Sequence, residues 1–331
     1  MNRAHKSTLS RRQLGSGARL LGDTEYALCI QMSSQVSFTF PEASAIARAL
    51  TGATKDIGAF SVRRLLPAIE QRAVGPFVFI DYIEPAQLPS GVGLDVRPHP
   101  HIGLATITYL FQGEFTHRDT LGSNQVIRPG DVNWMVAGRG IAHSERTGAE
   151  VRASGGPLHG VQTWVALPQT HEEMAPSFEH HPAATLPVVE RDGVKIRVIA
   201  GSAFGARANT GVVSPTLYAH ARFEPGSSLT IDAEHEERAA LVVAGNVTCS
   251  GHSFGDGSLV VLRPERVAEL RAEASADVLL LGGQKLDGHR HIWWNFVSSS
   301  RERIERAKQD WRSGAFGSVP GDEHEFIPLP E

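Results

Sequence analysis

The sequence predicts an all-β protein made of two similar β-domains, followed by one helix near the C-terminus. Short runs of apolar, β-branched and aromatic residues alternate with turn residues, which is the pattern of strands. The chain contains 33 glycines, as expected of a protein with many tight turns. The rhythm of strand, glycine and strand over residues 109–116 returns over residues 239–248, which indicates a degenerate internal repeat.

Composition excludes several classes of protein. The 331 residues are 41% hydrophobic and 21% charged, as in ordinary globular proteins, and the length suggests two domains. A formal net charge of −4 argues against direct nucleic-acid binding. No apolar run approaches the roughly 20 residues that span a membrane, so no membrane association is expected. With Cys29 and Cys249 far apart, a disulfide framework is not indicated, and we expect a cytoplasmic monomer.

Residues 1–31 show no periodicity and are predicted to be a disordered tail. Arg11 and Arg12 resemble a twin-arginine signal, but a glycine-rich polar stretch follows where an apolar segment should stand, so a signal peptide is rejected. Met32 is an alternative start, because recognisable pattern begins only after it.

The first β-domain is predicted over residues 55–182. Its expected strands are residues 60–66, 75–82, 104–110, 114–117, 132–136 and 161–167. A proline-rich approach to His99 separates the second of these from the third. A linker is predicted over residues 180–186, which are rich in proline and alanine.

The second β-domain is predicted over residues 190–290, with strands over residues 239–248, 258–262 and 277–283. It contains no His-x-His pair, so we expect it to bind no metal. Its equivalent strands carry apolar residues in place of metal ligands, namely Leu241, Val243, Leu279 and Leu281. His235 lies near the matching place beside acidic residues and is expected to be solvated.

Residues 291–331 are predicted to form a helix and a tail. Ser299 and Glu302 have the spacing of a capping box. Ile304, Ala307 and Trp311 then form one apolar stripe, which indicates that the helix packs back on a sheet. A glycine at position 314 is a reasonable end for this helix.

Two short motifs predict a metal site. Residues i and i+2 of a strand point to the same face, so His99 projects with His101, and His143 with Glu145. On facing strands, the two pairs bring three imidazoles and one carboxylate to one point. Such donors suit Fe, Mn, Ni, Cu or Zn, whereas Ca and Mg prefer oxygen ligands. A structural zinc site is the alternative, although such sites are usually closed and rich in cysteine.

These motifs and their spacing resemble the pirin family of the cupin superfamily. The resemblance covers residues 59–286 and is dense over residues 77–168. The matching residues are His99-Pro100-His101, Gly103, Tyr109-Leu110, Gly113, His117, Asp119, Pro129-Gly130-Asp131, Trp134-Met135, Ala137-Gly138, Gly140-Ile141 and His143-Ser144-Glu145. The wider cupin pattern has a glutamate a few residues after the His pair, and this chain has Leu104, Ala105 and Thr106 there.

The resemblance implies two cupin barrels, each a double-stranded β-helix or jelly roll, packed face to face with metal in the first barrel alone. It maps the metal ligands onto His99, His101, His143 and Glu145. One divalent ion per chain is expected, most simply Fe(II), with Mn, Ni, Cu and Zn as alternatives. Glu145 is also the expected catalytic base. His117 and His159 are expected to orient a ligand ring by hydrogen bonding.

Three functions remain open from the sequence. The first is a dioxygenase of the quercetin 2,3-dioxygenase type, with a flavonol-like or other enolisable phenolic substrate and O2. The second is a regulatory protein whose metal state controls binding to a protein partner. The third is a non-redox cupin enzyme such as an isomerase. Oxygen uptake with iron at the site would favour the dioxygenase. Complex formation without turnover would favour the regulatory protein, and activity without oxygen would favour the non-redox enzyme.

Overall fold

The structure is a computed structural model that describes residues 35–56 and 60–330. The tail predicted over residues 1–31 and the alternative start at Met32 lie outside the described residues. Within these ranges strands dominate, and the α-helices are α1 (Ala149–Ser154) and α2 (Arg301–Arg312). No helix in this part of the chain is long and apolar enough to cross a membrane.

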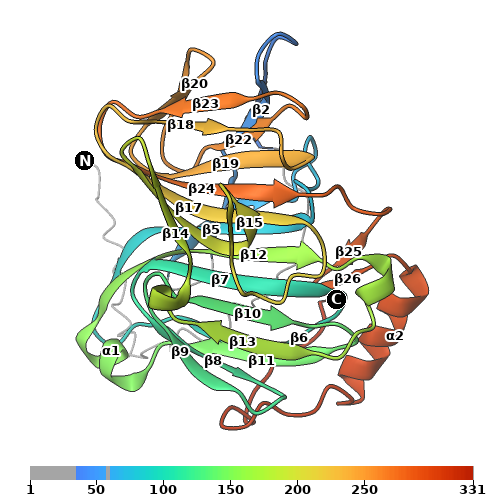
Figure 1. The fold of residues 1–331 in the computed structure, drawn as a ribbon. Helices are drawn as coiled ribbons and strands as arrows, with labels where there is room; N and C mark the ends of the chain where they lie inside the picture. The colour runs from blue at the N-terminus through green and yellow to red at the C-terminus, as the bar shows by residue number, and fades with distance from the viewer. Residues whose placement is uncertain (1–34, 57–59, 331) are drawn as a thin grey trace, which may run out of the picture.

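The first barrel has a seven-stranded and a four-stranded sheet that enclose its interior (Figure 1). The larger sheet consists, in order, of β13 (Ser177–His181), β10 (Val132–Val136), β7 (Leu104–Gln112), β12 (Gly156–Ala166), β5 (Phe77–Leu88), β4 (Ser61–Leu66) and β3 (Ala53–Asp56). The smaller sheet consists of β6 (Asp95–His101), β11 (Ile141–Arg146), β8 (Phe115–Asp119) and β9 (Asn124–Ile127). All six strands predicted in this half are present, and β5 and β12 are longer than predicted.

The second barrel repeats this plan. Its nine-stranded sheet consists of β1 (Ser37–Thr39), β2 (Ile46–Leu50), β22 (Leu259–Leu262), β19 (Glu237–Ala244), β24 (Ala276–Gly283), β17 (Thr216–Phe223), β15 (Val194–Ala203) and β14 (Val188–Arg191), with β16 (Ala206–Arg207) beside β15. Its smaller sheet consists of β18 (Ser228–Ile231), β23 (Ala268–Arg271), β20 (Val247–Cys249) and β21 (His252–Phe254). The prediction of two β-barrels is therefore confirmed.

Two strands that precede the first barrel in sequence belong to the second. β2 pairs antiparallel with β22, with Ala49 opposite Val260, and β1 pairs with β2. Ile46 and Leu50 of β2 are fully buried. Figure 1 shows this blue hairpin beside the strands of the second barrel. The start of the described chain thus completes the barrel formed by its second half, which the sequence did not predict.

The two larger sheets pack against each other, as predicted. On β7, Ile107 and Tyr109 point toward the second barrel, where they join a buried cluster with Tyr218 and Leu279. The intervening residues of β7 point into the first barrel. A single strand therefore serves both the junction between the barrels and the interior of one of them.

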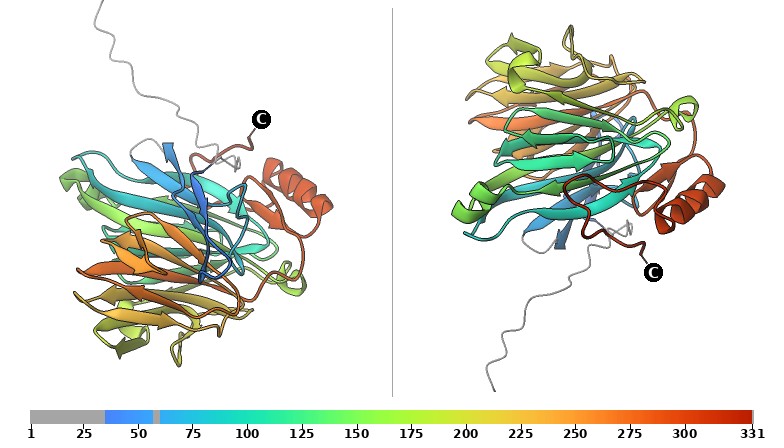
Figure 2. Two further views of the ribbon diagram at one scale, coloured as in Figure 1. Left: turned by 90° about the horizontal axis from the view of Figure 1, so that it is seen from above. Right: turned by 90° about the horizontal axis from the view of Figure 1, so that it is seen from below.

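The C-terminal segment packs on the first barrel (Figure 2). The hairpin of β25 (His291–Trp293) and β26 (Phe296–Ser298) precedes α2, and Phe296 forms a parallel bridge with Ile102. Ile304 and Ala307 are buried on the side of α2 that faces the barrel, as the apolar stripe predicts. Farther on, the backbone N–H of Ile327 donates to the carbonyl of Pro98.

The predicted start of α2 is wrong by one residue. Ser300 is the N-cap, and its Oγ accepts a hydrogen bond from the backbone N–H of Arg303. Ser299 instead donates its backbone N–H and its hydroxyl to the buried carboxylate of Glu172. A run of three serines offers three candidate caps, and the contact with Glu172 decides between them.

Candidate metal centre

Two paired strands of the smaller sheet carry the predicted ligands. Among the described strands, β6 pairs with β11 alone and lies at the edge of the sheet. An edge position tolerates Pro98 and Pro100, which have no N–H to donate to a neighbour. His99 lies directly opposite His143 in this pairing. A bulge between His143 and Glu145 then shifts the register.

Gly103 ends the His-x-His motif because the C-terminal hairpin approaches it closely. Its φ of +68° lies in the left-handed region, and a Cβ here would lie 2.0 Å from the carbonyl oxygen of Val297. Any other residue would push β26 away from the strand that carries His101.

The three imidazoles converge, as the spacing predicts. His99, His101 and His143 each offer a donor atom within 4.8 Å of the others, and among the described residues they form the one such group of three or more potential ligands. The Nε2 atoms of His101 and His143 lie 3.1 Å apart. Burial lowers the pKa of His99 to about 4 and holds the pKa of the other two rings well below the usual value. All three rings are therefore neutral at neutral pH, which is the form that ligates metals.

Backbone carbonyls fix the orientation of two of these rings. Nδ1 of His99 donates to the carbonyl of Arg97 at 2.9 Å. Nδ1 of His101 donates to the carbonyl of Asn295 at 3.2 Å, and Asn295 belongs to the C-terminal segment. With Nδ1 protonated, the Nε2 lone pair of each ring is available to a metal.

Two hydrogen bonds in series, from Asp119 through His117, fix the orientation of the His143 ring. Asp119 Oδ2 lies 3.0 Å from Nε2 of His117, and Nδ1 of His117 lies 3.3 Å from Nδ1 of His143. Burial opposes ionisation of Asp119, but the hydrogen bond from His117 holds its pKa below the usual value. An ionised Asp119 accepts from Nε2–H of His117, whose Nδ1 then accepts from Nδ1–H of His143. The Nε2 lone pair of His143 is thereby left for the centre.

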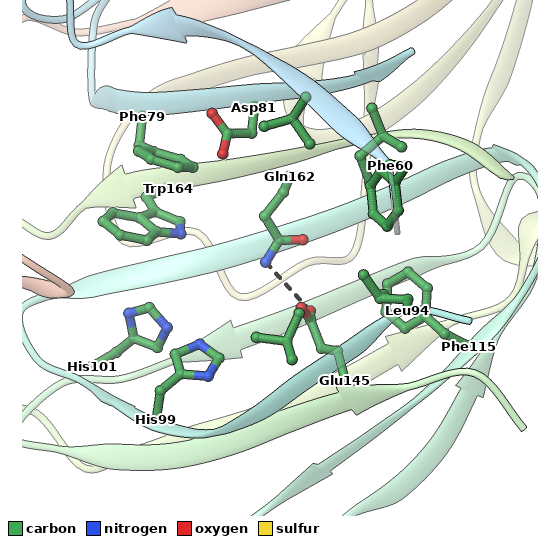
Figure 3. Close-up of a pocket in the computed structure, with 13 residues that line it drawn as sticks. Phe60, Phe79, Asp81, Leu94, His99, His101, Phe115, Glu145, Gln162 and Trp164 are labelled. Carbon is green, nitrogen blue, oxygen red and sulfur yellow. Dashed lines mark hydrogen bonds between the residues drawn. The ribbon is translucent and has the colours of Figure 1, made fainter. Parts of the chain in front are cut away.

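Glu145 lies in the same pocket, but its carboxylate is not within 4.8 Å of the donor atoms of all three imidazoles. Nε2 of Gln162 donates to its Oε1 at 3.4 Å (Figure 3), and Thr108 Oγ1 donates to the amide oxygen of Gln162 at 2.7 Å. Burial raises the pKa of the Glu145 carboxyl to about 7, although hydrogen bonds from these partners oppose the rise. Burial therefore disfavours an isolated negative charge at this position.

The walls above the imidazoles are apolar and aromatic (Figure 3). Phe79 and Trp164 stack with ring centroids 4.1 Å apart, and the indole meets the edge of His101. Behind Phe79, the guanidinium of Arg64 forms a buried bidentate pair with Asp81, at 2.8 and 2.7 Å. The remaining apolar lining consists of Phe60, Val62, Ile83, Leu94, Val96 and Phe115.

His159 does not lie beside these imidazoles, which corrects its expected place. Its Nε2 is 3.1 Å from the hydroxyl of Tyr82, and its ring packs on Phe111 at the junction between the barrels. The register between β12 and β7 shifts after His159, and this histidine faces the second barrel as Val161 does. Strand alternation thus directs His159 away from the face that carries Gln162.

Sequence reasoning missed three residues that hold the site together. Asp119 was part of the matched motif, and its i+2 spacing from His117 was the available signal. Gln162 shares a strand face with Trp164, but its partner Glu145 belongs to the other sheet. Asn295 acts through its backbone carbonyl, for which a sequence gives no signal.

Comparison with family models identifies both halves of the chain. The model described as pirin matches residues 59–165, and the model described as pirin C-terminal cupin domain matches residues 218–317.

Individual proteins agree with these matches. A pirin-like protein of Caulobacter vibrioides is 50% identical over 280 residues, which cover 84% of this chain and 96% of the relative. A Pseudomonas aeruginosa protein named "Putative quercetin 2,3-dioxygenase" is 39% identical over 82% of this chain and 86% of its own length. The crystal structure of a quercetin 2,3-dioxygenase from Acinetobacter baumannii has a TM-score of 0.80 and 32% identity, over 86% of this chain and 94% of that one.

Proposed function

The chain belongs to the pirin family, and we propose that it is a metal-dependent dioxygenase of the quercetin 2,3-dioxygenase type. Its proposed substrates are a flavonol-like or other enolisable phenolic compound and dioxygen. The observation that carries this proposal is the group of three buried imidazoles on one side of an aromatic-walled pocket. Two relatives that carry the name quercetin 2,3-dioxygenase support it.

The proposed ligands are His99, His101, His143 and Glu145, which together hold one divalent ion. The donor set fits such an ion, because the lone pairs of His101 Nε2 and His143 Nε2 face each other across 3.1 Å in a buried site. Two acceptors at that distance repel each other unless a cation lies between them. We propose Fe(II), with Mn, Ni, Cu and Zn as ions that the same donors accept.

The proposed roles of the residues follow from their contacts. When bound, Fe(II) supplies a Lewis acid and an electron relay between the organic substrate and dioxygen. Glu145 is proposed to leave the metal briefly and accept the proton of the substrate hydroxyl, because its carboxylate lines the pocket beside the imidazoles. Gln162 orients that carboxylate by donating to its Oε1.

The pocket walls are proposed to hold a flat aromatic substrate. Phe60, Phe79, Phe115 and Trp164 offer ring faces and edges to such a molecule and exclude water from the reacting atoms. Asp81 lines the pocket, but its charge is matched by the guanidinium of Arg64, so the lining has little net charge apart from Glu145. A largely apolar phenol fits such a lining better than a highly charged compound does.

The test is metal analysis followed by oxygen uptake. Protein loaded with Fe(II) is titrated with quercetin and other flavonols in an oxygen electrode, with metal content measured by mass spectrometry on the same sample. We expect uptake that scales with iron occupancy and is lost in His101→Ala. His289→Ala, which removes an exposed histidine that does not line the pocket, is the matched control and should retain uptake.

Two outcomes would contradict the proposal. Iron-loaded protein that consumes no oxygen with any flavonol would favour a regulatory binding protein. Turnover of a phenolic compound without oxygen would favour a non-redox cupin enzyme.

A further inference from the structure

A second polar cavity lies at the junction between the barrels, outside the metal pocket. It encloses about 270 Å³. The first barrel contributes Tyr109, Phe111 and His159 to its lining. The second barrel contributes four charged or titratable side chains, namely Arg197, His220, Arg222 and Asp277. We call this space the junction cavity.

Strand pairing builds the cationic side of the junction cavity. Arg197 on β15 lies directly opposite His220 on β17, and Arg222 on β17 lies opposite Asp277 on β24. The four side chains therefore occupy neighbouring positions on one face of the larger sheet of the second barrel. Tyr109 reaches this group from β7 of the first barrel.

A chain of hydrogen bonds occupies one wall and engages Oδ1 of the Asp277 carboxylate. Nε2 of His220 donates to Asp277 Oδ1 at 2.7 Å, and the same oxygen accepts from Nε of Arg222 at 3.1 Å. Nδ1 of His220 then accepts from the hydroxyl of Tyr109 at 3.1 Å. Arg222 therefore balances the negative charge of Asp277. The positive charge of Arg197 is not balanced by this carboxylate.

Arg197 is left with a positive charge and few partners. Its guanidinium forms no ion pair among the residues that the structure describes, and its Nε is buried without a hydrogen-bond partner. The one hydrogen bond it makes, from Nη1 to the hydroxyl of Tyr109, is long at 3.5 Å. A half-buried guanidinium that lacks a carboxylate is costly unless an anion supplies the missing charge.

The aromatic side of the junction cavity adds no negative charge. Phe111 lies between the rings of His159 and His220, with centroids 4.7 and 5.1 Å away. Tyr82 donates its hydroxyl to the carbonyl of Val243 and accepts from Nε2–H of His159. Two arginines against one carboxylate therefore leave the cavity with a net positive charge, with all imidazoles counted as neutral.

We propose that the junction cavity binds a small oxyanion, a carboxylate or a phosphate, through the guanidinium of Arg197. Planar guanidinium groups bind the oxygens of either anion by paired, charge-assisted hydrogen bonds. A cavity of about 270 Å³ is near the lower limit for small-molecule sites, so the ligand is a small metabolite or an inorganic ion rather than a macromolecule. Both barrels contribute to the site, so an anion bound there also strengthens their junction.

This site is independent of the proposed metal centre. Tyr109 faces the junction cavity, whereas its neighbour Thr108 faces the metal pocket and binds Gln162. The two sites therefore lie on opposite faces of β7. Failure of one proposal leaves the other intact.

The test is calorimetric titration of the full chain, as purified with its metal, using sodium phosphate and sodium succinate as probes at constant ionic strength. We expect saturable binding of at least one probe with a dissociation constant of about 1 mM or tighter. Tighter binding of phosphate assigns a phosphorylated ligand, and tighter binding of succinate assigns a carboxylic acid. Titrations of both probes without saturable binding would overturn the proposal.

Three variants locate the binding. Arg197→Gln should weaken binding by about tenfold or more, because it removes charge-assisted hydrogen bonds. Arg207→Gln removes the same charge from an exposed position on β16 and should bind as the parent does. His101→Ala should also bind as the parent does, which excludes binding of the probe to the metal.

Contrary results from these variants are equally clear. Equal binding by Arg197→Gln and the parent would overturn the proposal, as would equal losses in Arg197→Gln and Arg207→Gln. If Arg197→Gln does not fold, Arg222→Gln at the rim of the junction cavity replaces it, with a smaller loss expected. Unchanged affinity in that variant would then count against the site.

Discussion

The two barrels have the same strand plan and opposite interiors. The strands that carry the proposed ligands of the first barrel are β6 and β11, and they occupy the places that β18 and β23 occupy in the second. The inward positions of β18 and β23 carry Leu229 with Ile231 and Ala268 with Leu270, all buried in one apolar cluster. Where the first barrel directs three imidazoles and a carboxylate inward, the second directs four apolar side chains.

This comparison corrects how the second barrel was matched to the first. Leu241, Val243, Leu279 and Leu281 were expected to stand in the ligand positions. They instead face the first barrel and join the cluster between the barrels. The expectation for His235 was also wrong, because its ring is buried and its Nε2 donates to the carbonyl of Ser202.

A pocket interrupts the apolar packing of the first barrel, whereas the packing of the second barrel is continuous. The interior of the second barrel is one cluster of aliphatic and aromatic side chains, as in a close-packed protein core. The interior of the first is divided into two clusters with the pocket and its buried histidines between them. Buried neutral imidazoles need their hydrogen-bond partners, so the first barrel depends on residues that the second does not require.

The largest effect, on metal binding, is expected when histidines of the first barrel are replaced by the apolar residue type found at the matching positions of the second. Replacing His99 and His101 together by leucine copies the apolar pair on β18. The chain should still fold, since leucine suits a buried strand, but metal binding should be lost. The loss should exceed the roughly 10–100-fold that residues behind a ligand contribute to metal affinity. Metal content by mass spectrometry is the measurement, and full metal content in the double variant would refute the ligand assignment.

The next prediction tests the role of the Glu145 carboxylate separately from that of the imidazoles. Glu145→Gln is nearly isosteric, so packing is retained while the base is removed. Dioxygenase activity at matched metal occupancy should fall by about 10²–10⁴, as is typical when a general base is lost. Oxygen uptake with quercetin measures this. Turnover at the parent rate in metal-loaded Glu145→Gln would show that the carboxylate has no role as a base.

The stability of the second barrel should depend more on the packing of its apolar interior than on any polar group. Leu280→Ala opens a cavity among the fully buried side chains of the second barrel and should lower the free energy of unfolding by about 2–5 kcal/mol. Leu121→Ala at a position that is 50% exposed is the matched control and should change it by less than about 0.5 kcal/mol. Urea unfolding of the two variants gives the comparison. Equal values would mean that the stability of the second barrel does not depend on the close packing of its interior.

The smallest effect concerns the hydrogen bonds behind His143. His117→Ala removes the acceptor for Nδ1–H of His143 and should reduce metal affinity by about 10–100-fold. His252→Ala, at an exposed position in the second barrel, should leave the affinity unchanged. Competition with a chelator measures both. An unchanged affinity in His117→Ala would mean that the carbonyl contacts of the other two rings suffice.

The sequence by itself determined the strands and the facing of the metal motifs. Strand alternation is a local property of period two, so the spacing of His99 with His101 is enough to put both rings on one face. Alternation does not say which face of a strand meets the pocket, and this choice was wrong for His159 and for the apolar residues of the second barrel. A bulge, or a choice between the two faces of a strand, depends on what packs against it.

Only the tertiary structure decided which distant groups complete each site. The carbonyl that orients His101 belongs to Asn295, 194 residues away, and the hairpin that completes the second barrel comes from the start of the described chain. The junction cavity likewise combines side chains from both barrels, with Tyr109 and His220 separated by 111 residues. Hydrogen bonds and charge pairs act over a few ångströms in space, and no local pattern in the chain records which residues the fold brings within that range.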